Sequence, residues 1–270
     1  MKAQVTLTVA ESKRLIGKAV KEHPWVKKAL KSGIIAIGTG STNAYVVEEI
    51  LGIEIEKKRH IAGFIDEEGA CIVPRDERSK SIVLDNGRRV DESLEAVAKR
   101  MGRDDVFIKG ANALDFDGIA GVMMASLTGG TVGDVIGTLK ARGIKLLIPV
   151  GLEKLICHSV AEASNIAGIY EMDYSDGVPV GIMPISGEVI TEIEAFMILS
   201  DVDAVNIGAG GIGSGEGSKT FILHGKEGKV SKALRILESI RGEENIEPLR
   251  GKCKDCVYLY CPRNKSKKDK

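Results

Sequence analysis

A run of small and hydroxylated residues, Gly-Thr-Gly-Ser-Thr, follows a short apolar segment near the start of the chain. The apolar segment covers 34–37, and apolar side chains recur at helical spacing over 45–51. A strand, a glycine turn and a helix start in this order form an anion site, because glycines admit a ligand close to the backbone and free N–H groups point toward it. We therefore predict phosphate binding by Gly38, Thr39, Gly40, Ser41 and Thr42. The alternative is an ordinary turn in which Ser41 or Thr42 caps the helix.

Two later segments could reach the same ligand. Residues 109–115 follow a strand expected at 105–108, and Gly129, Gly130 and Thr131 open an expected helix. Ligands of parallel α/β sheets lie at the carboxyl ends of the strands, so we expect these segments to meet the first turn. Lys109 and Asn112 would then lie at the reacting end of the ligand. Asp115 is the candidate base for a proton transfer, and Lys109 would stabilise an enediolate.

The alternation of strands and helices predicts an α/β fold, with a Rossmann-like parallel sheet that carries helices on both faces. Strands are expected at 34–37, 71–74, 81–84, 105–108, 145–150, 178–184, 203–207 and 220–223, and helices from residue 8 onward and at 24–30, 94–101, 152–163, 188–199 and 230–240. The pattern changes near residue 170. We expect a main α/β domain at 1–170, a small α+β lobe at 171–245 and a basic, cysteine-containing tail at 246–270.

The composition limits the possible partners. The 270 residues are 43% apolar but only 4% aromatic, which predicts an aliphatic core. The 38 basic residues balance 38 acidic ones, so we do not expect a nucleic-acid or membrane partner. No apolar run reaches transmembrane length and no signal-peptide core is seen, which favours a cytoplasmic protein. A single glutamine, Gln4, in a Lys-, Glu- and Ile-rich chain is typical of a thermophilic source.

Three cysteines near the C-terminus, Cys253, Cys256 and Cys261, have C-x2-C-x4-C spacing. They could bind zinc if a fourth ligand is supplied by a partner chain or by Cys71, Cys157, His158 or His224. An iron–sulfur cluster held by the three thiolates is the other metal hypothesis. The alternative without metal is a set of reduced thiols or a disulfide. The glycine-rich stretch at 208–218 has no Walker spacing, so no nucleotide cofactor is evident.

The turn Gly38-Thr39-Gly40-Ser41-Thr42-Asn43-Ala44-Tyr45 resembles the phosphate turn Gly-Thr-Gly-Ser-Thr-Ala of ribose-5-phosphate isomerase A. The similarity covers about residues 10–52 and continues in patches over 103–155. The wider superfamily includes glucosamine-6-phosphate deaminases, CoA transferases and the sugar-phosphate-sensing domains of DeoR-type repressors. The resemblance implies a sugar-phosphate ligand, an isomerase-like reaction and a homo-oligomer.

The chain departs from that isomerase at its acid–base residues. Lys109-Gly110-Ala111-Asn112-Ala113 stands in place of Asp-Gly-Ala-Asp-Glu, and Thr128-Gly129-Gly130 in place of Lys-Gly-Gly. Since Asn112 cannot act as a base, a standard ribose-5-phosphate isomerase is not expected. Residues 133–138 also resemble methylthioribose-1-phosphate isomerase, which would leave Asp115 or Asp134 as the carboxylate. The remaining hypotheses are a divergent isomerase-type enzyme, a non-catalytic sugar-phosphate sensor, and a metal- or iron–sulfur-binding protein.

Overall fold

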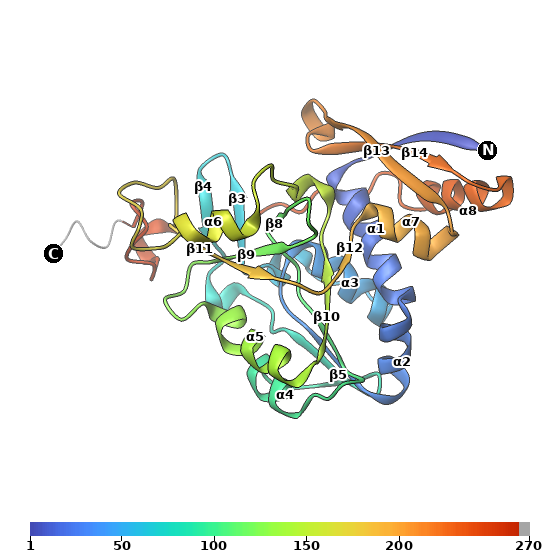
Figure 1. Ribbon diagram of the computed structural model, residues 1–270. Coiled ribbons are helices and arrows are strands. Elements are labelled where there is room, and N and C mark those ends of the chain that lie inside the picture. Colours follow the sequence, from blue (N-terminus) through green and yellow to red (C-terminus); the bar gives the residue numbers. More distant parts are fainter. Residues whose placement is uncertain (265–270) are drawn as a thin grey trace.

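The computed structural model, shown in Figure 1, describes residues 1–264 of the chain. Its main element is a six-stranded mixed sheet with the order β12-β10-β7-β2-β5-β6. The strands of this sheet are β2 (Ile34–Ile37), β5 (Ile82–Asp85), β6 (Arg88–Val90), β7 (Val106–Ile108), β10 (Lys145–Pro149) and β12 (Glu188–Ile190). The fold is therefore mixed α/β, and the four strands from β12 to β2 run parallel.

Both faces of this sheet are covered, because the side chains of its central strands alternate between two apolar cores. In β2, Ile35 and Ile37 belong to one core, and Ile34 and Ala36 belong to the other. The first core is built mainly by α1 (Val9–Glu22), α2 (Pro24–Ser32), α3 (Ser41–Leu51), α7 (Glu192–Ser200) and α8 (Glu227–Glu238). The second core is covered by α4 (Leu94–Arg100) and α5 (Gly130–Arg142). As predicted, aliphatic side chains dominate both cores.

Smaller antiparallel sheets surround the main sheet (Figure 1). One contains β1 (Lys2–Leu7), β14 (Ser218–His224) and β13 (Asp203–Gly210), so the start of the chain pairs with a segment more than 200 residues later. Another contains β8 (Ala113–Leu114), β9 (Ala120–Met124) and β11 (Gly181–Ile185). The hairpin of β3 (Gly63–Asp66) and β4 (Gly69–Ile72) stands beside the cysteine tail.

The structure corrects several expectations about individual elements. Strand β5 is antiparallel to β2, so the sheet is not wholly parallel. The helix expected at 188–199 begins only at Glu192, because the preceding residues form β12 of the main sheet and Thr191 caps α7 with a capping box. Residues 152–163 do not form one helix but a short 3₁₀ turn followed by α6 (Val160–Ile166). Residues 265–270 of the predicted basic tail lie outside the described part of the chain.

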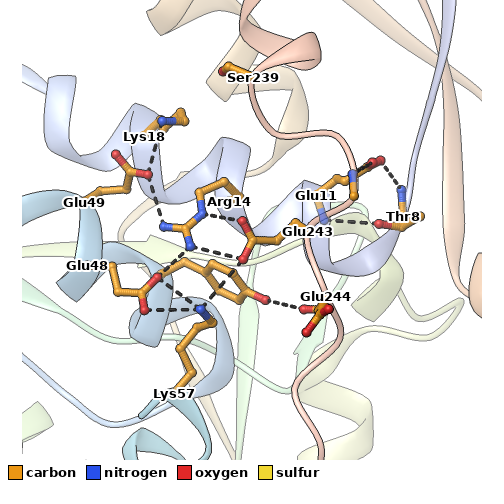
Figure 2. A network of polar contacts seen from close by, with 12 residues as sticks. Thr8, Glu11, Arg14, Lys18, Glu48, Glu49, Lys57, Ser239, Glu243 and Glu244 are labelled. Carbon is orange, nitrogen blue, oxygen red and sulfur yellow. Dashed lines mark hydrogen bonds and ion pairs between the residues drawn. The ribbon is translucent and has the colours of Figure 1, made fainter. Parts of the chain in front are cut away.

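A charge network around Arg14 joins α1, α3 and the segment that follows α8 (Figure 2). The Arg14 guanidinium lies 2.6 Å from the Glu48 carboxylate and 2.8 Å from that of Glu243, measured between nitrogen and oxygen atoms. Lys57 also reaches Glu48, at 3.2 Å. Burial raises the pKa of Glu48, but hydrogen bonds from the Ile55 N–H, Arg14 and Lys57 outweigh burial and hold the pKa below its usual value. The network thus fixes the C-terminal half of α3 with its charges paired.

Candidate functional site: an anion pocket at two helix starts

A pocket of about 230 Å³ opens where the parallel strands β2, β7 and β10 end. Its lining includes the loop after β2, the segment after β7 and the start of α5, which are the three segments expected to meet. The residues predicted to bind phosphate, Thr39, Gly40, Ser41, Thr42, Gly129, Gly130 and Thr131, all contribute to it, and Lys109 and Asn112 also line it. Gly38 follows directly after β2 and is not among the lining residues. The pocket is therefore at the edge of the sheet where α/β proteins place their ligands.

The first wall of the pocket is the turn into α3. The Gly40 N–H donates to the backbone oxygen of His60 at 2.8 Å, and the Asn43 side chain donates to the Gly38 oxygen at 2.7 Å. These bonds hold the turn open while no described side chain caps the start of α3. The Thr42 hydroxyl oxygen is buried and has no hydrogen-bond partner among residues 1–264. A free hydroxyl beside uncapped N–H groups can serve an anionic ligand.

The second wall is the start of α5. Gly129 and Gly130 both have positive φ, 78° and 56°, which favours glycine over other residues. This conformation turns successive N–H groups toward one side, as in other backbone anion sites. In the described residues no side chain caps this helix either. Two helix starts, each with its positive dipole end, thus face one pocket.

The charged residues of the pocket are all basic within residues 1–264: Lys109, Lys154 and Arg78 line it, and no carboxylate does. Lys109 packs closely against Gly38, because a β-carbon there would lie 3.1 Å from the lysine Cδ, a tight contact. Burial, and to a smaller extent the charge of Lys154, lowers the pKa of Lys109 to about 8. One guanidinium nitrogen of Arg78, Nη2, is buried without a hydrogen-bond partner in the described chain.

The two remaining catalytic candidates have structural hydrogen bonds. The Asn112 side-chain oxygen accepts from the Met123 N–H at 3.0 Å, although the residue still lines the pocket. Asp115 lies outside the pocket lining and is buried. Its carboxylate accepts from the N–H groups of Asp117, Ile119 and Val160 at 2.8 to 3.1 Å. The structure therefore brings Lys109 and Asn112, but not Asp115, into one pocket with the residues predicted to bind phosphate. Asp134 is exposed on α5.

A buried group of charges beside the pocket was not found from the sequence. Lys154 lines the pocket, and its Nζ lies 4.0 Å from Glu153, whose two carboxylate oxygens are buried without hydrogen-bond partners in the described chain. Glu192 is fully buried nearby and accepts from the Leu152 N–H at 2.9 Å. Burial and the Glu153 charge raise the pKa of Glu192 to about 7. Perturbed, buried groups of this kind are frequent at functional sites, but the sequence pattern gives no sign of them.

His60 is a second residue whose place could not be read from the sequence. It follows the basic run at 57–59, a pattern typical of a solvated edge, yet it is buried next to the turn into α3. Burial lowers its pKa to about 4, against the opposing effect of a hydrogen bond with the Gly38 backbone. His60 is therefore neutral near pH 7, and its backbone oxygen accepts from the Gly40 N–H of the turn.

The cysteines of the tail lie beside a separate cavity. Cys253, Cys256 and Cys261 line it together with Cys71 of β4. Within residues 1–264, no three Cys, His, Asp or Glu side chains converge closely enough to ligate one ion. All five cysteines are free thiols.

Comparison with known proteins gives no relative: no protein-family model, no curated protein and no solved structure matches the chain. Across residues 1–264, no helix combines the length and the apolar character needed to cross a membrane.

Proposed function

We propose that this protein binds a phosphorylated small metabolite, a sugar phosphate, with the phosphoryl group at Gly38–Thr42. The proposal includes the fold relationship suggested by the sequence: a divergent, Rossmann-like member of the superfamily that contains ribose-5-phosphate isomerase A. It does not include standard ribose-5-phosphate isomerase activity, because the carboxylates of that enzyme's motif are replaced in residues 109–113.

One observation carries the proposal: two uncapped helix starts and three basic side chains face a pocket whose described lining holds no carboxylate. A phosphoryl group has several oxygens that accept hydrogen bonds, and its charge matches the two helix dipoles. The buried Thr42 hydroxyl and Arg78 Nη2 would gain partners from such a ligand. The size of the cavity, about 230 Å³, suits a small metabolite better than a dinucleotide.

The reaction we propose is an isomerisation or a related proton transfer, with Lys109 as the residue at the reacting end. A pKa of about 8 lets Lys109 exchange a proton near neutral pH, and its cationic form can stabilise an enediolate. Asp115 is a poor base in this geometry, because three backbone N–H groups already occupy its carboxylate. Asn112 would contribute its amide nitrogen to the ligand.

A second candidate function is a sugar-phosphate sensor without catalysis. It is favoured by the same absence of a carboxylate from the described pocket lining, since aldose–ketose isomerisation ordinarily uses a carboxylate base. The two candidates share the ligand and differ only in turnover.

A thermal-shift screen tests the shared part of the proposal. The panel contains ribose 5-phosphate, ribulose 5-phosphate, hexose and aminosugar phosphates, CoA and nucleotides, with the unphosphorylated sugars as controls. We expect one phosphorylated sugar to raise the melting temperature of the wild type and not that of Gly40→Asp. A shift by the free sugar alone, or by no compound, would contradict the proposal. Incubation of the bound sugar followed by product analysis then separates enzyme from sensor.

A further inference from the structure

The cavity beside the cysteine tail is formed by three parts of the chain that are far apart in sequence, at 70–77, 177–178 and 249–264. Its volume is about 530 Å³, and it lies between β4, the 3₁₀ turn Arg75–Glu77 and the tail. Four of the five cysteines line it. The fifth, Cys157, is exposed in the loop before α6, and neither His158 nor His224 lines this cavity. Of the four candidates for a fourth ligand in this chain, the structure therefore places only Cys71 with the tail thiols.

The tail presents its cysteines on consecutive turns. The N–H of Cys256 donates to the oxygen of Cys253 at 3.4 Å, and the N–H of Cys261 donates to the oxygen of Tyr258 at 3.1 Å. The buried Asn264 side chain connects these turns, since its Nδ2 donates to the backbone oxygens of Cys256 and Tyr258 at 2.8 and 3.2 Å. The turns that carry the three thiols are thus joined into one unit.

Apolar burial does little to hold this unit in place. Val257 is 73% exposed and Leu259 53% exposed, although both lie between the cysteines. The tail instead contacts the β3–β4 hairpin through ion pairs of Arg250 with Asp66 and Glu68 and of Arg263 with Glu68. Partly exposed ion pairs contribute little stability. Small segments without an apolar core commonly depend on a metal or a disulfide.

We propose that Cys71 joins Cys253, Cys256 and Cys261 to bind one zinc ion, which fixes the tail to β4. Four thiolates form the tetrahedral ligand set that structural zinc prefers. Each thiol releases its proton to solvent as the ion binds. The four side chains do not share one centre in the described structure, so zinc binding requires that they turn toward the ion.

The proposed zinc site and the anion pocket share lining residues. Cys71 and Tyr258 line both cavities, so the segments held by the ion form one wall of the pocket. This consequence depends on the proposed function, whereas zinc binding itself does not.

Metal content tests the site directly. The full chain is purified anaerobically, loaded with zinc, dialysed against a moderate chelator and analysed by mass spectrometry for bound metal. We expect about one zinc ion per chain in the wild type and in Cys157→Ser, which removes a thiol outside the cavity. Cys71→Ser should retain at least tenfold less zinc under the same dialysis, and Cys71→His, which restores a ligand, should recover most of it.

The visible absorption of the cobalt-substituted protein gives a second readout. The wild type should show the spectrum of a four-thiolate site, and Cys71→Ser should lose it. Full zinc retention in a folded Cys71→Ser, a protein that binds no zinc, or an iron–sulfur cluster unaffected by Cys71→Ser would each overturn the proposal. None of these readouts involves a sugar phosphate, so failure of this inference is distinct from failure of the proposed function.

Discussion

The two ends of α3 differ in whether their polar groups have partners in the protein. Toward its C-terminal end, Glu48 is 5% exposed and is fully paired with Arg14, Lys57 and a backbone N–H (Figure 2). At its start, the Thr42 hydroxyl is buried without a partner in the described chain, and the adjacent cations face no carboxylate of the pocket lining. Paired charges at one end hold the helix in place, and the proposed ligand would pair the free hydroxyl and cations at the other end. The contrast predicts that mutations at the two ends affect different quantities.

The largest effect is expected at the paired end. Arg14→Met removes the guanidinium that the buried Glu48 and the partly buried Glu243 share and leaves them only Lys57, which should lower the free energy of unfolding by up to about 3 kcal/mol. Denaturant unfolding measures this change. The control is Lys80→Met, which breaks the exposed ion pair with Asp91 and should change the free energy of unfolding far less. Equal effects of the two variants would show that the Arg14 network is not the main anchor of α3.

The carboxylate pair behind the pocket is an intermediate case, since it is buried but incompletely paired. The pKa of Glu192 is raised in the folded state, so its contribution to stability is present below pH 4.5 and is lost as the pH rises toward 7. We expect a loss of about 2 to 3 kcal/mol over this range. Glu192→Gln keeps an acceptor for the Leu152 N–H and should flatten that part of the stability profile. The same pH dependence in both proteins would assign the effect to other groups.

At the open end, a negative charge should weaken binding without unfolding the protein. Gly40→Asp has steric room, because a β-carbon there would lie 4.0 Å from the nearest described atom, the Asn43 Cβ. The new carboxylate would oppose the phosphoryl group at the helix start and weaken binding roughly 30-fold. Calorimetric titration with the sugar phosphate found in the screen measures this loss. Gly40→Ala, the uncharged control, should bind within a fewfold of the wild type.

The smallest expected effect gives the sharpest contrast between stability and binding. Thr42→Val preserves the shape of the side chain but removes its hydroxyl, which has no partner within residues 1–264. The free energy of unfolding should stay equal or rise by up to about 1 kcal/mol, since a buried unsatisfied group is lost. Ligand affinity should fall about fivefold, because one hydrogen bond to the phosphoryl group is missing. A loss of stability with unchanged affinity would mean that the hydroxyl serves the fold.

The sequence predicted those parts of the site that depend on local pattern. The strand–turn–helix at 34–51 and the glycine-rich start of α5 were identified from apolar spacing and glycine position. Their convergence followed from the rule for strand ends, which needs no knowledge of side-chain packing. The strand β12 was missed because its three residues adjoin the apolar pattern of α7, although the capping box of Thr191 and Glu194 marks the boundary between them.

What the sequence could not supply was the pairing of distant groups. Asp115 has the right residue type, but its carboxylate is used by nearby backbone and by the start of α6. The meeting of Glu153 with Glu192, and of Cys71 with the tail, depends on tertiary packing between segments 39 or more residues apart. No spacing rule reports such contacts.

The most direct test of the central claim is an amide NMR titration with the sugar phosphate selected by the screen. If both helix starts bind one ligand, the amide signals of residues 40–43 and 130–132 should shift together with one dissociation constant. The signals around Glu48 and Glu243 should move little. Shifts confined to one helix start would contradict a shared site. Unchanged signals at both starts, with a ligand that binds elsewhere, would contradict the anion pocket altogether.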